Sequence, residues 1–297
     1  MLNLAPLRYV KVMEADGGPI ARLEHAYCDI FGVPCVHAVA YLKQGIVAPE
    51  LLQMRVIAQP DGAGAHESAQ IACYMAISEA MERWAVHYCR ERLISGMGGM
   101  DLDFSSNGFA AYPGVFRRQA REAAYRESIE RHCLIGWWEG LLGHRCIENP
   151  RPGVSAIIID HRFSAHTVVL LWSMTAYGHS YSFGAGHNVA HAVQRALVEL
   201  SRTQSMLKQL VKLSLPLRAG RRGDVFERRI HYFSTDEGVS LFLERLKRQV
   251  KTVRARPKVL FDSAVYGPWD AYASVWRTVF EAPSQDYLSE REDYFFW

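Results

Sequence analysis

The chain has 297 residues, of which 49% are apolar and 22% charged, the ordinary composition of a globular protein. This length allows one large domain or two small ones, and the net charge of +3 is too small to indicate a nucleic-acid partner. No apolar run is long enough to span a membrane, and the first residues lack the basic flank and apolar stretch of a signal peptide.

The six cysteines are scattered and form no Cys-x-x-Cys motif, which argues against a structural zinc site. In a chain without an export signal they indicate reduced thiols and a cytoplasmic location. The histidines contain no His-Glu-x-x-His pattern, so they do not identify a metalloprotease.

The first sixty residues mix short apolar runs with turns. Residues 8–12 are predicted as a strand and residues 33–42 as one or two more. Residues 59–64 are predicted as a turn or loop, whose Gly62-Ala63-Gly64 can let backbone amides approach a phosphate.

Two long helices follow, each with a Glu-x-x-Glu-Arg motif. The first is predicted over residues 66–93, with Ser68 as its cap and a glycine-rich stop at 95–99, and the second over residues 115–142. The glutamate pairs are Glu79 with Glu82 and Glu127 with Glu130. Glutamates three positions apart share a helix face, so each helix presents two carboxylates together. Four such carboxylates can bind hard cations; the alternative is two solvated charged faces.

The second half of the chain alternates strand and helix signals. Strands are predicted over residues 154–160, 167–175, 258–261 and 273–280, and helices over 189–210 and 239–250. Gly184-Ala185-Gly186 precedes the helix that holds Arg195 and Glu199 on one face. Residues 214–223 are the best candidate for a linker or surface loop, and the chain ends in an aromatic segment.

Three ordered stretches resemble the YcaO family, over about residues 60–205. They are Gly62-Ala63-Gly64 with the first glutamate motif, Ser106-Asn107-Gly108 with the second, and Gly184-Ala185-Gly186 with Arg195 and Glu199. The resemblance implies an α/β (α+β) fold. It also implies a single domain of two pseudo-symmetric halves, with mixed sheets and long helices lining a nucleotide site, as the internal repeat indicates.

The same resemblance implies an ATP- and Mg²⁺-dependent enzyme that phosphorylates an amide oxygen while a nucleophile adds to the amide carbon. Phosphorylation converts a poor leaving group into a good one, and Mg²⁺ neutralises the charge that develops in the transfer. By resemblance the metal ligands are Glu79, Glu82, Glu127 and Glu130, the phosphate contacts are Arg131 and Arg195, and the nucleotide contacts are Ser106, Asn107 and Glu199. Carboxylates gathered so closely would repel one another without cations.

Three departures from the family pattern favour one chemistry over another. Ala63 stands where members often have lysine, and Arg202, with Gln204 nearby, stands where they often have glutamine. Azoline-forming members typically end in Pro-x-Pro-x-Pro, whereas this chain ends in Tyr294-Phe295-Phe296-Trp297, and no extra domain for gripping a leader peptide is evident. We therefore expect thioamide formation with a sulfur nucleophile, on an amide-containing small molecule such as a nucleobase (guanine to thioguanine) or on a peptide.

The sulfur source is open among free sulfide, a sulfur-donor protein and a cysteine of this chain. Cys133 shares a helix face with Glu130, and Cys89 lies on the first long helix. Cys133 is the candidate relay and His132 the candidate base; the alternative for Cys133 is a buried structural thiol.

Three other functions are compatible with the sequence. An azoline-forming cyclodehydratase acting on a ribosomal peptide is one, and a YcaO-like partner protein without catalysis is another. A simple ATPase or kinase is the third. The expected partners are the amide substrate and a second copy of the chain in a homodimer, with neither nucleic acid nor membrane.

Overall fold

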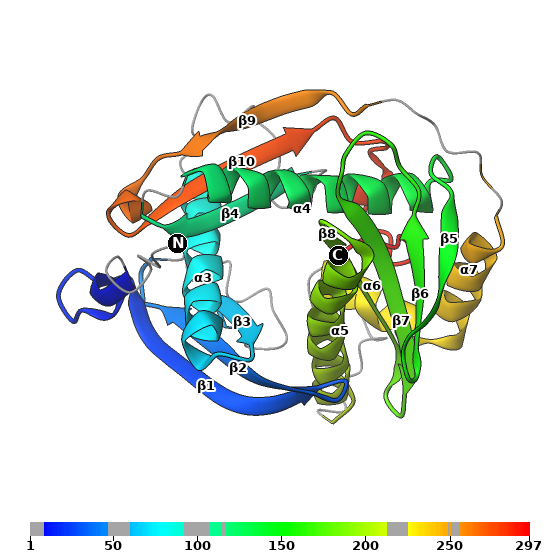
Figure 1. The fold of residues 1–297 in the computed structure, drawn as a ribbon, viewed down its shortest axis with the longest axis horizontal. Coiled ribbons are helices and arrows are strands. Elements are labelled where there is room, and N and C mark those ends of the chain that lie inside the picture. Colours follow the sequence, from blue (N-terminus) through cyan, green and yellow to red (C-terminus); the bar gives the residue numbers. More distant parts are fainter. Residues whose placement is uncertain are drawn as a thin grey trace. The chain divides into compact units, whose positions relative to one another are not determined.

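The computed structural model describes residues 9–46, 60–91, 107–114, 117–212, 225–248, 250 and 256–297 (Figure 1). The chain divides into two compact units. The first comprises Met1–Asp103, Asn107–Tyr125 and Val259–Val279, and the second Phe104–Ser106, Arg126–Lys258 and Phe280–Trp297. The single-domain assignment remains a prediction.

The first unit contains two three-stranded sheets and one long helix. Strands β1 (Ile20–Ile30), β2 (Val33–Leu42) and β3 (Gly62–His66) form one sheet in that order, and α3 (Ala69–Glu91) packs on β2 and β3 (Figure 1). The second sheet has the order β4 (Asn107–Pro113), β10 (Ala273–Phe280) and β9 (Val259–Val265).

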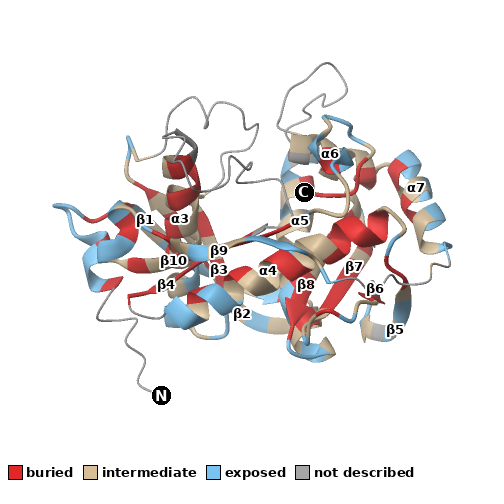
Figure 2. Cartoon of the chain, turned by 90° about the horizontal axis from the view of Figure 1, so that it is seen from above, coloured by how far each residue is buried: buried red, intermediate tan, exposed pale blue. Residues whose placement is uncertain are grey.

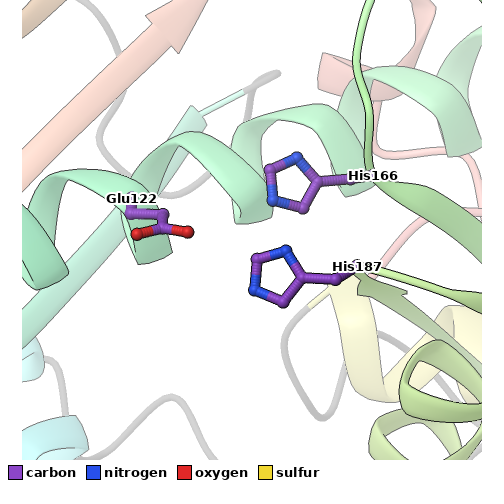
Figure 3. Close-up of side chains that lie close together, drawn as sticks. All are labelled: Glu122, His166 and His187. Atoms are coloured by element: carbon purple, nitrogen blue, oxygen red, sulfur yellow. The ribbon is translucent and has the colours of Figure 1, made fainter.

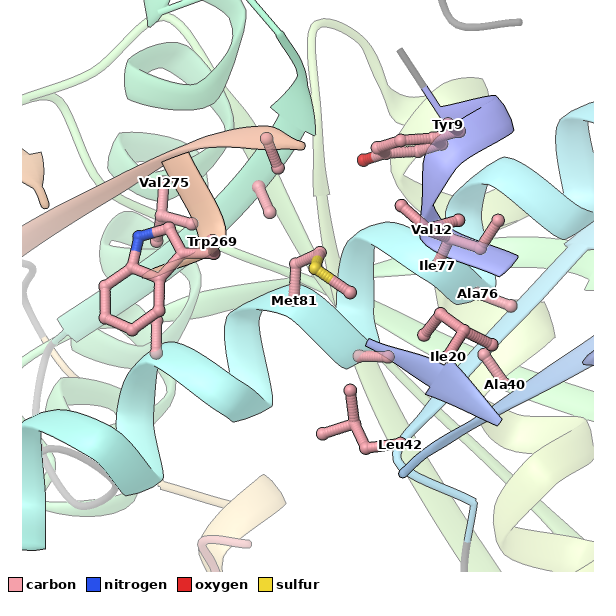
Figure 4. Packing of buried hydrophobic residues seen from close by; sticks show 14 of the residues in the cluster. Tyr9, Val12, Ile20, Ala40, Leu42, Ala76, Ile77, Met81, Trp269 and Val275 are labelled. Carbon is pink, nitrogen blue, oxygen red and sulfur yellow. The ribbon is translucent and has the colours of Figure 1, made fainter. Parts of the chain in front are cut away.

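The core of the first unit lies between α3 and these strands. Met81 and Ile77 of α3 are buried beside Val12 and Ile20, and Trp269 is fully buried at the other end of the cluster (Figure 4). Trp269, in the 3-10 helix η2 (Pro268–Ala271), donates its indole N–H to the Val265 carbonyl oxygen at 2.9 Å. This hydrogen bond satisfies the polar atom that burial of a tryptophan would otherwise leave without a partner.

The second unit is built on one four-stranded sheet. Its order is β5 (His144–Arg151), β6 (Val154–Ile159), β7 (Thr167–Thr175) and β8 (Gly178–Gly186), and α5 (Val189–Lys212) packs on β7 and β8. Buried residues dominate β7 and β8 (Figure 2). Helices α6 (Val225–Ser234) and α7 (Asp236–Leu246) complete this unit. Helix α4 (Arg117–Trp138) begins in the first unit and ends in the second.

The final segment of the second unit is packed inside it. The short helix η3 (Asp286–Leu288) leads into Tyr294, Phe295 and Phe296, all of which are buried. Arg229 of α6, itself fully buried, donates hydrogen bonds to the carbonyl oxygens of this segment. The acceptors are Tyr287, Ser289, Arg291 and Phe296, at 2.7–3.0 Å. One guanidinium therefore satisfies four backbone acceptors of a segment that has no sheet partner.

Several sequence-based expectations need correction. Residues 8–12 were expected as a strand, but Val10–Met13 form a 3-10 helix, η1. Its buried Val12 and the neighbouring Tyr9 anchor it, and the Tyr9 hydroxyl lies 2.8 Å from Ser78 Oγ. The loop expected at 59–64 is in part strand β3. The prediction of mixed sheets is wrong as well, because the strand pairs with a defined register are antiparallel. Short connections can join antiparallel neighbours, whereas parallel strands need long crossover connections.

The other predicted elements agree with the structure to different degrees. The three long helices and the strands β2, β6, β7, β9 and β10 are confirmed with shifted ends, whereas β1, β5, β8 and α6 were not foreseen. The linker expected at 214–223 and the helix stop at 95–99 lie outside the described residues.

Candidate active site

The first glutamate pair holds the backbone of two strands, β3 and β4, that belong to different sheets of the first unit. In the first unit, Glu79 Oε2 accepts a hydrogen bond from the Ala63 backbone N–H at 3.1 Å, and Glu82 Oε1 accepts one from Ala111 at 2.8 Å. Both glutamates are partly buried on α3, between the strands β3 and β4 that they contact. They are therefore held in fixed positions and are not solvated helix residues.

The glycines around Ala63 serve the close approach of β3 to α3. A Cβ on Gly62 would lie 2.0 Å from the Ala76 carbonyl oxygen, and one on Gly64 would lie 2.3 Å from that of Ala72. Any side chain would thus collide with the helix backbone. The Ala63 N–H is directed at Glu79, and the two glycines allow the strand to pack against the helix backbone; the phosphate approach expected of this segment stays a prediction.

The second unit repeats this packing at its other Gly-Ala-Gly. Cβ atoms on Gly184 and Gly186 would lie 2.8 Å and 2.5 Å from backbone atoms of Ala192 in α5. The middle residue again uses its N–H for a glutamate, because Ala185 donates to Glu130 Oε2 at 2.6 Å. The two units therefore share a strand-and-helix device in which α5 corresponds to α3, and the glutamate in the second unit comes from α4.

Glu130 stands in an unusual electrostatic setting. Burial raises its pKa from the ordinary 4.5 to about 7, although Arg195 and the Ala185 N–H favour the charged form. Glu127, one turn earlier, raises the pKa further and itself pairs with Arg131 at 2.9 Å. Glu127 and Glu130 thus place two carboxylates close together, and one of them keeps a proton near neutral pH. A divalent cation would neutralise this pair better than a single proton does.

The four glutamates are divided between the units. Glu79 and Glu82 belong to the first, and Glu127 and Glu130 to the second. Each pair is placed within its own unit, and the meeting of both pairs around one nucleotide remains a prediction.

Comparison with known proteins gives the fold. No protein-family model matches the chain, and no curated protein does. Among solved structures, YcaO from Methanopyrus kandleri bound with AMPPCP and Mg²⁺ matches with a TM-score of 0.55 at 14% identity, over 96% of this chain and 90% of that one. The E. coli microcin synthetase McbBCD complex with pro-MccB17 matches with a TM-score of 0.57 at 12% identity, over 92% and 89%.

The chain has the YcaO fold. A heterocyclase in complex with substrate and cofactor also matches, with a TM-score of 0.53 at 11% identity over 93% of this chain, which spans about half (51%) of that protein. These identities are low enough that the likeness concerns the fold, and the chemistry has to be argued from the residues of this chain.

The residues that the resemblance assigns to the nucleotide and phosphates, and the departure Arg202, lie as follows in the structure. On α5, Glu199 Oε1 forms an ion pair with Arg202 Nη1 at 2.7 Å, and Gln204 Nε2 donates to Ser173 Oγ at 2.7 Å. Arg195, on the same helix, is exposed. Ser106 lies outside the described residues, and Asn107 is paired with Val279 in the β4–β10 register.

The candidate relay and the candidate base are buried to different degrees. Cys133 is fully buried, and burial, followed by the nearby charge of Glu130, raises its thiol pKa well above the ordinary value. His132 packs edge-on against Phe163 and Phe280, and burial lowers its pKa to about 4. A reactive thiolate needs an accessible, electropositive setting. These features favour the structural-thiol alternative for Cys133 and make His132 a neutral, weakly basic imidazole at pH 7.

A run of histidines in the second unit was not singled out from the sequence. The rings of His166 and His187 lie 5.3 Å apart (Figure 3), and His187 stacks on His191 with 5.7 Å between ring centroids. Ser164 Oγ lies 3.0 Å from His166 Nδ1 and orients that ring. Burial lowers the pKa of His191, and the charge of Arg195 lowers it further. The available signal was His187 directly after Gly184-Ala185-Gly186, with His191 four residues later in the first turn of α5.

Among the described residues, no helix combines the length and the apolarity needed to cross a bilayer.

Proposed function

We propose that the chain is an ATP- and Mg²⁺-dependent enzyme that activates an amide or lactam carbonyl oxygen by phosphorylation. The observation that carries this proposal is the Glu127, Glu130, Arg131 and Arg195 group within a YcaO fold, with Glu130 protonated near neutral pH in the absence of a cation. The M. kandleri YcaO with the same fold was solved with an ATP analogue and Mg²⁺, which supports the same ligands here.

The donor chemistry fits Mg²⁺. Carboxylate oxygens are the protein ligands that this hard cation prefers, and bound Mg²⁺ would neutralise phosphate charge during transfer. We assign Glu79, Glu82, Glu127 and Glu130 to the metal, Arg131 and Arg195 to the phosphates, and Ser106, Asn107 and Glu199 to the nucleotide. In Glu79, Glu82 and Glu130 one carboxylate oxygen accepts a backbone N–H, which orients the group toward its proposed role.

We favour sulfur as the nucleophile, giving a thioamide on a small molecule such as a nucleobase. The enzyme is proposed to be cytoplasmic and homodimeric.

Two alternatives have observations behind them. Peptide cyclodehydration is supported by the likeness to McbBCD and to the heterocyclase. A non-catalytic partner protein is supported by the Glu199–Arg202 ion pair, which engages a carboxylate assigned to the nucleotide.

Phosphate release tests these possibilities together. The purified chain is incubated with ATP, Mg²⁺ and candidate amides, guanine among them, with and without sulfide, and product masses are recorded. Thioamidation requires turnover that depends on both amide and sulfide, with oxygen replaced by sulfur in the product, and Glu79→Gln should abolish it. If ATP neither binds nor turns over under any combination, the enzyme proposal is wrong and the non-catalytic alternative stands.

A further inference from the structure

Two cysteines that are separate in the sequence lie opposite each other on the β1–β2 hairpin. The strand register pairs Cys28 with Cys35. The connecting residues Phe31 and Gly32 have φ angles of 51° and 83°, as in a tight hairpin turn of type I′, and the Gly32 N–H donates to Asp29 Oδ1 at 2.7 Å. This turn sets the register, and a slip of one residue would place the two thiols on opposite faces.

The pairing gives the two cysteines a backbone separation that suits a disulfide. Hydrogen-bonded and non-hydrogen-bonded pairs alternate along an antiparallel ladder, and Pro34, opposite Asp29, has no N–H to donate. Cys28 and Cys35 therefore occupy a hydrogen-bonded pair, with Cα atoms about 5.5 Å apart. This lies inside the range of about 4.4–6.8 Å found for the Cα atoms of disulfides, so the register is compatible with a disulfide.

The pair is accessible, in contrast to the cysteines considered for sulfur relay. Along β2 the buried residues Val36, Ala38 and Ala40 alternate with Cys35, so the thiols lie on the other face of this sheet. Cys28 and Cys35 are each partly exposed, whereas Cys133 and Cys89 are buried. A small sulfur species can reach the hairpin pair without any opening of the core.

The two thiols have different surroundings. A backbone hydrogen bond with His37 lowers the pKa of Cys28, in opposition to the larger effect of burial and the charge of Asp29, so that its pKa remains raised. The pKa of Cys35 is raised by burial first, then by Cys28 and by the charge of Glu67. The strand register, and not a lowered pKa, defines the pair: it places Cys35 opposite Cys28, where Cys35 can react with a group that Cys28 acquires.

We propose that Cys28 and Cys35 form a dithiol site that accepts sulfane sulfur from a persulfide donor and releases it as sulfide. The Cys28 thiolate attacks the outer sulfur of the donor R–S–SH, forming Cys28–S–SH and releasing R–S⁻. The Cys35 thiolate then attacks Cys28 Sγ, which forms the Cys28–Cys35 disulfide and expels HS⁻. A dithiol reductant returns both residues to thiols and is itself oxidised to a disulfide.

The site would supply the sulfur nucleophile of the reaction proposed above, and in that use it rests on the proposed function. The sulfur-transfer steps need neither ATP nor an amide. Their chemistry can therefore be tested separately from the activation of a carbonyl group.

The test compares the wild-type chain with Cys28→Ser, Cys35→Ser, the double variant and Cys146→Ser, which removes an exposed cysteine elsewhere. Each prereduced protein receives glutathione persulfide without ATP, Mg²⁺, amide or added reductant, and sulfide release and intact mass are followed. The wild type and Cys146→Ser should release one sulfide per chain and become two hydrogens lighter, with a bridge mapped to Cys28 and Cys35. The single variants should release sulfide at least about tenfold more slowly, because the intramolecular attack is lost.

The Cys35→Ser variant provides a further readout, since it should accumulate one added sulfur on Cys28. Equal release by the wild type and the double variant, or a bridge mapped to other cysteines, would overturn the site. Sulfide release in this assay, combined with no ATP turnover and no thioamide in the separate assay with ATP, Mg²⁺, amide and sulfide, would leave the site standing and refute the proposed function. Thioamide formation from free sulfide by the double variant, combined with no sulfide release from the wild type in this assay, would refute the site and leave the proposed function standing.

Discussion

Replacing Glu130 by glutamine is expected to stabilise the cation-free chain above neutral pH while abolishing the proposed activity. Glutamine keeps an oxygen that can accept the Ala185 N–H, now 2.6 Å from Glu130 Oε2, and removes the charge whose burial is unfavourable. Residues that bind a ligand often lower the stability of the ligand-free protein, and Glu130 is expected to be such a residue.

The magnitude follows from the pKa of Glu130. Raising that pKa from 4.5 to about 7 corresponds to about 3 kcal/mol, at about 1.4 kcal/mol per pH unit. The folded state binds this proton more tightly than the unfolded chain does. Protonation of Glu130 therefore stabilises the folded wild type. This contribution to the unfolding free energy is complete below pH 4.5, is lost as the pH rises toward 7, and is absent above about pH 7. At pH 8 the variant should exceed the wild type by up to about 3 kcal/mol in unfolding free energy.

Urea unfolding in the presence of a metal chelator measures this difference at pH 5 and pH 8. Tryptophan fluorescence follows the unfolding, and Trp137 and Trp138, on the helix α4 that carries Glu130, contribute to it. Glu127→Gln is the matched control. It removes a neighbouring carboxylate, but one in a partly exposed ion pair with Arg131, so it should cost at most about 1 kcal/mol. Both variants should lose ATP turnover, and Mg²⁺ with an ATP analogue should stabilise only the wild type appreciably.

The reasoning would be refuted by a Glu130→Gln variant that is no more stable than the wild type at pH 8. The same conclusion would follow if its advantage did not shrink between pH 8 and pH 5. Retained ATP turnover in that variant would instead remove Glu130 from the metal site.

Three further substitutions test the packing and the enclosed thiol. Gly62→Ala places a Cβ 2.0 Å from the Ala76 carbonyl oxygen and should cost about 3 kcal/mol or more. Gly136→Ala is the control, because its Cβ meets only side chains, Leu142 at 3.0 Å and Pro283 at 3.8 Å, and it should leave the unfolding midpoint unchanged or higher. Equal midpoints for the two variants would contradict the close-packing argument. Arg229→Met leaves four carbonyl groups without their donor, two of them in buried hydrogen bonds, and should cost about 4 kcal/mol and open the final segment to limited proteolysis. An unchanged digestion pattern would show that the aromatic residues hold the segment alone. Cys133→Ala should retain sulfide-dependent turnover within about twofold, since the thiol is buried, and its loss in a folded variant would restore the relay assignment.

The sequence by itself determined the elements whose signals are local. The 3.6-residue periodicity placed α3, α4 and α5, and continuous β-branched runs placed β6 and β7, because each pattern is complete within its own segment. The Glu-x-x-Glu-Arg motifs, by their order among the Gly-Ala-Gly segments, were sufficient to predict the YcaO fold that the comparisons show.

Elements whose stability depends on distant partners were not predictable in this way. Most positions of β1 are exposed, so it has no clear alternation, and β3 consists largely of glycine and alanine, which have low strand propensity. Both are strands because β2 pairs with them on either side and α3 packs on the resulting sheet. The backbone of the final segment is held by hydrogen bonds from Arg229, which lies 58 residues before Tyr287 and 67 residues before Phe296 in the chain.

The chemistry of individual side chains was likewise decided by tertiary structure. The sequence identified Glu130 and Cys133 as neighbours on a helix, but only burial of that helix protonates the one near pH 7 and makes the other unreactive. Cys28 and Cys35 carried no motif, and a hairpin register made them a pair. Spacing along the chain determines which residues share a face, whereas desolvation and cross-strand contact depend on what the rest of the chain places against that face.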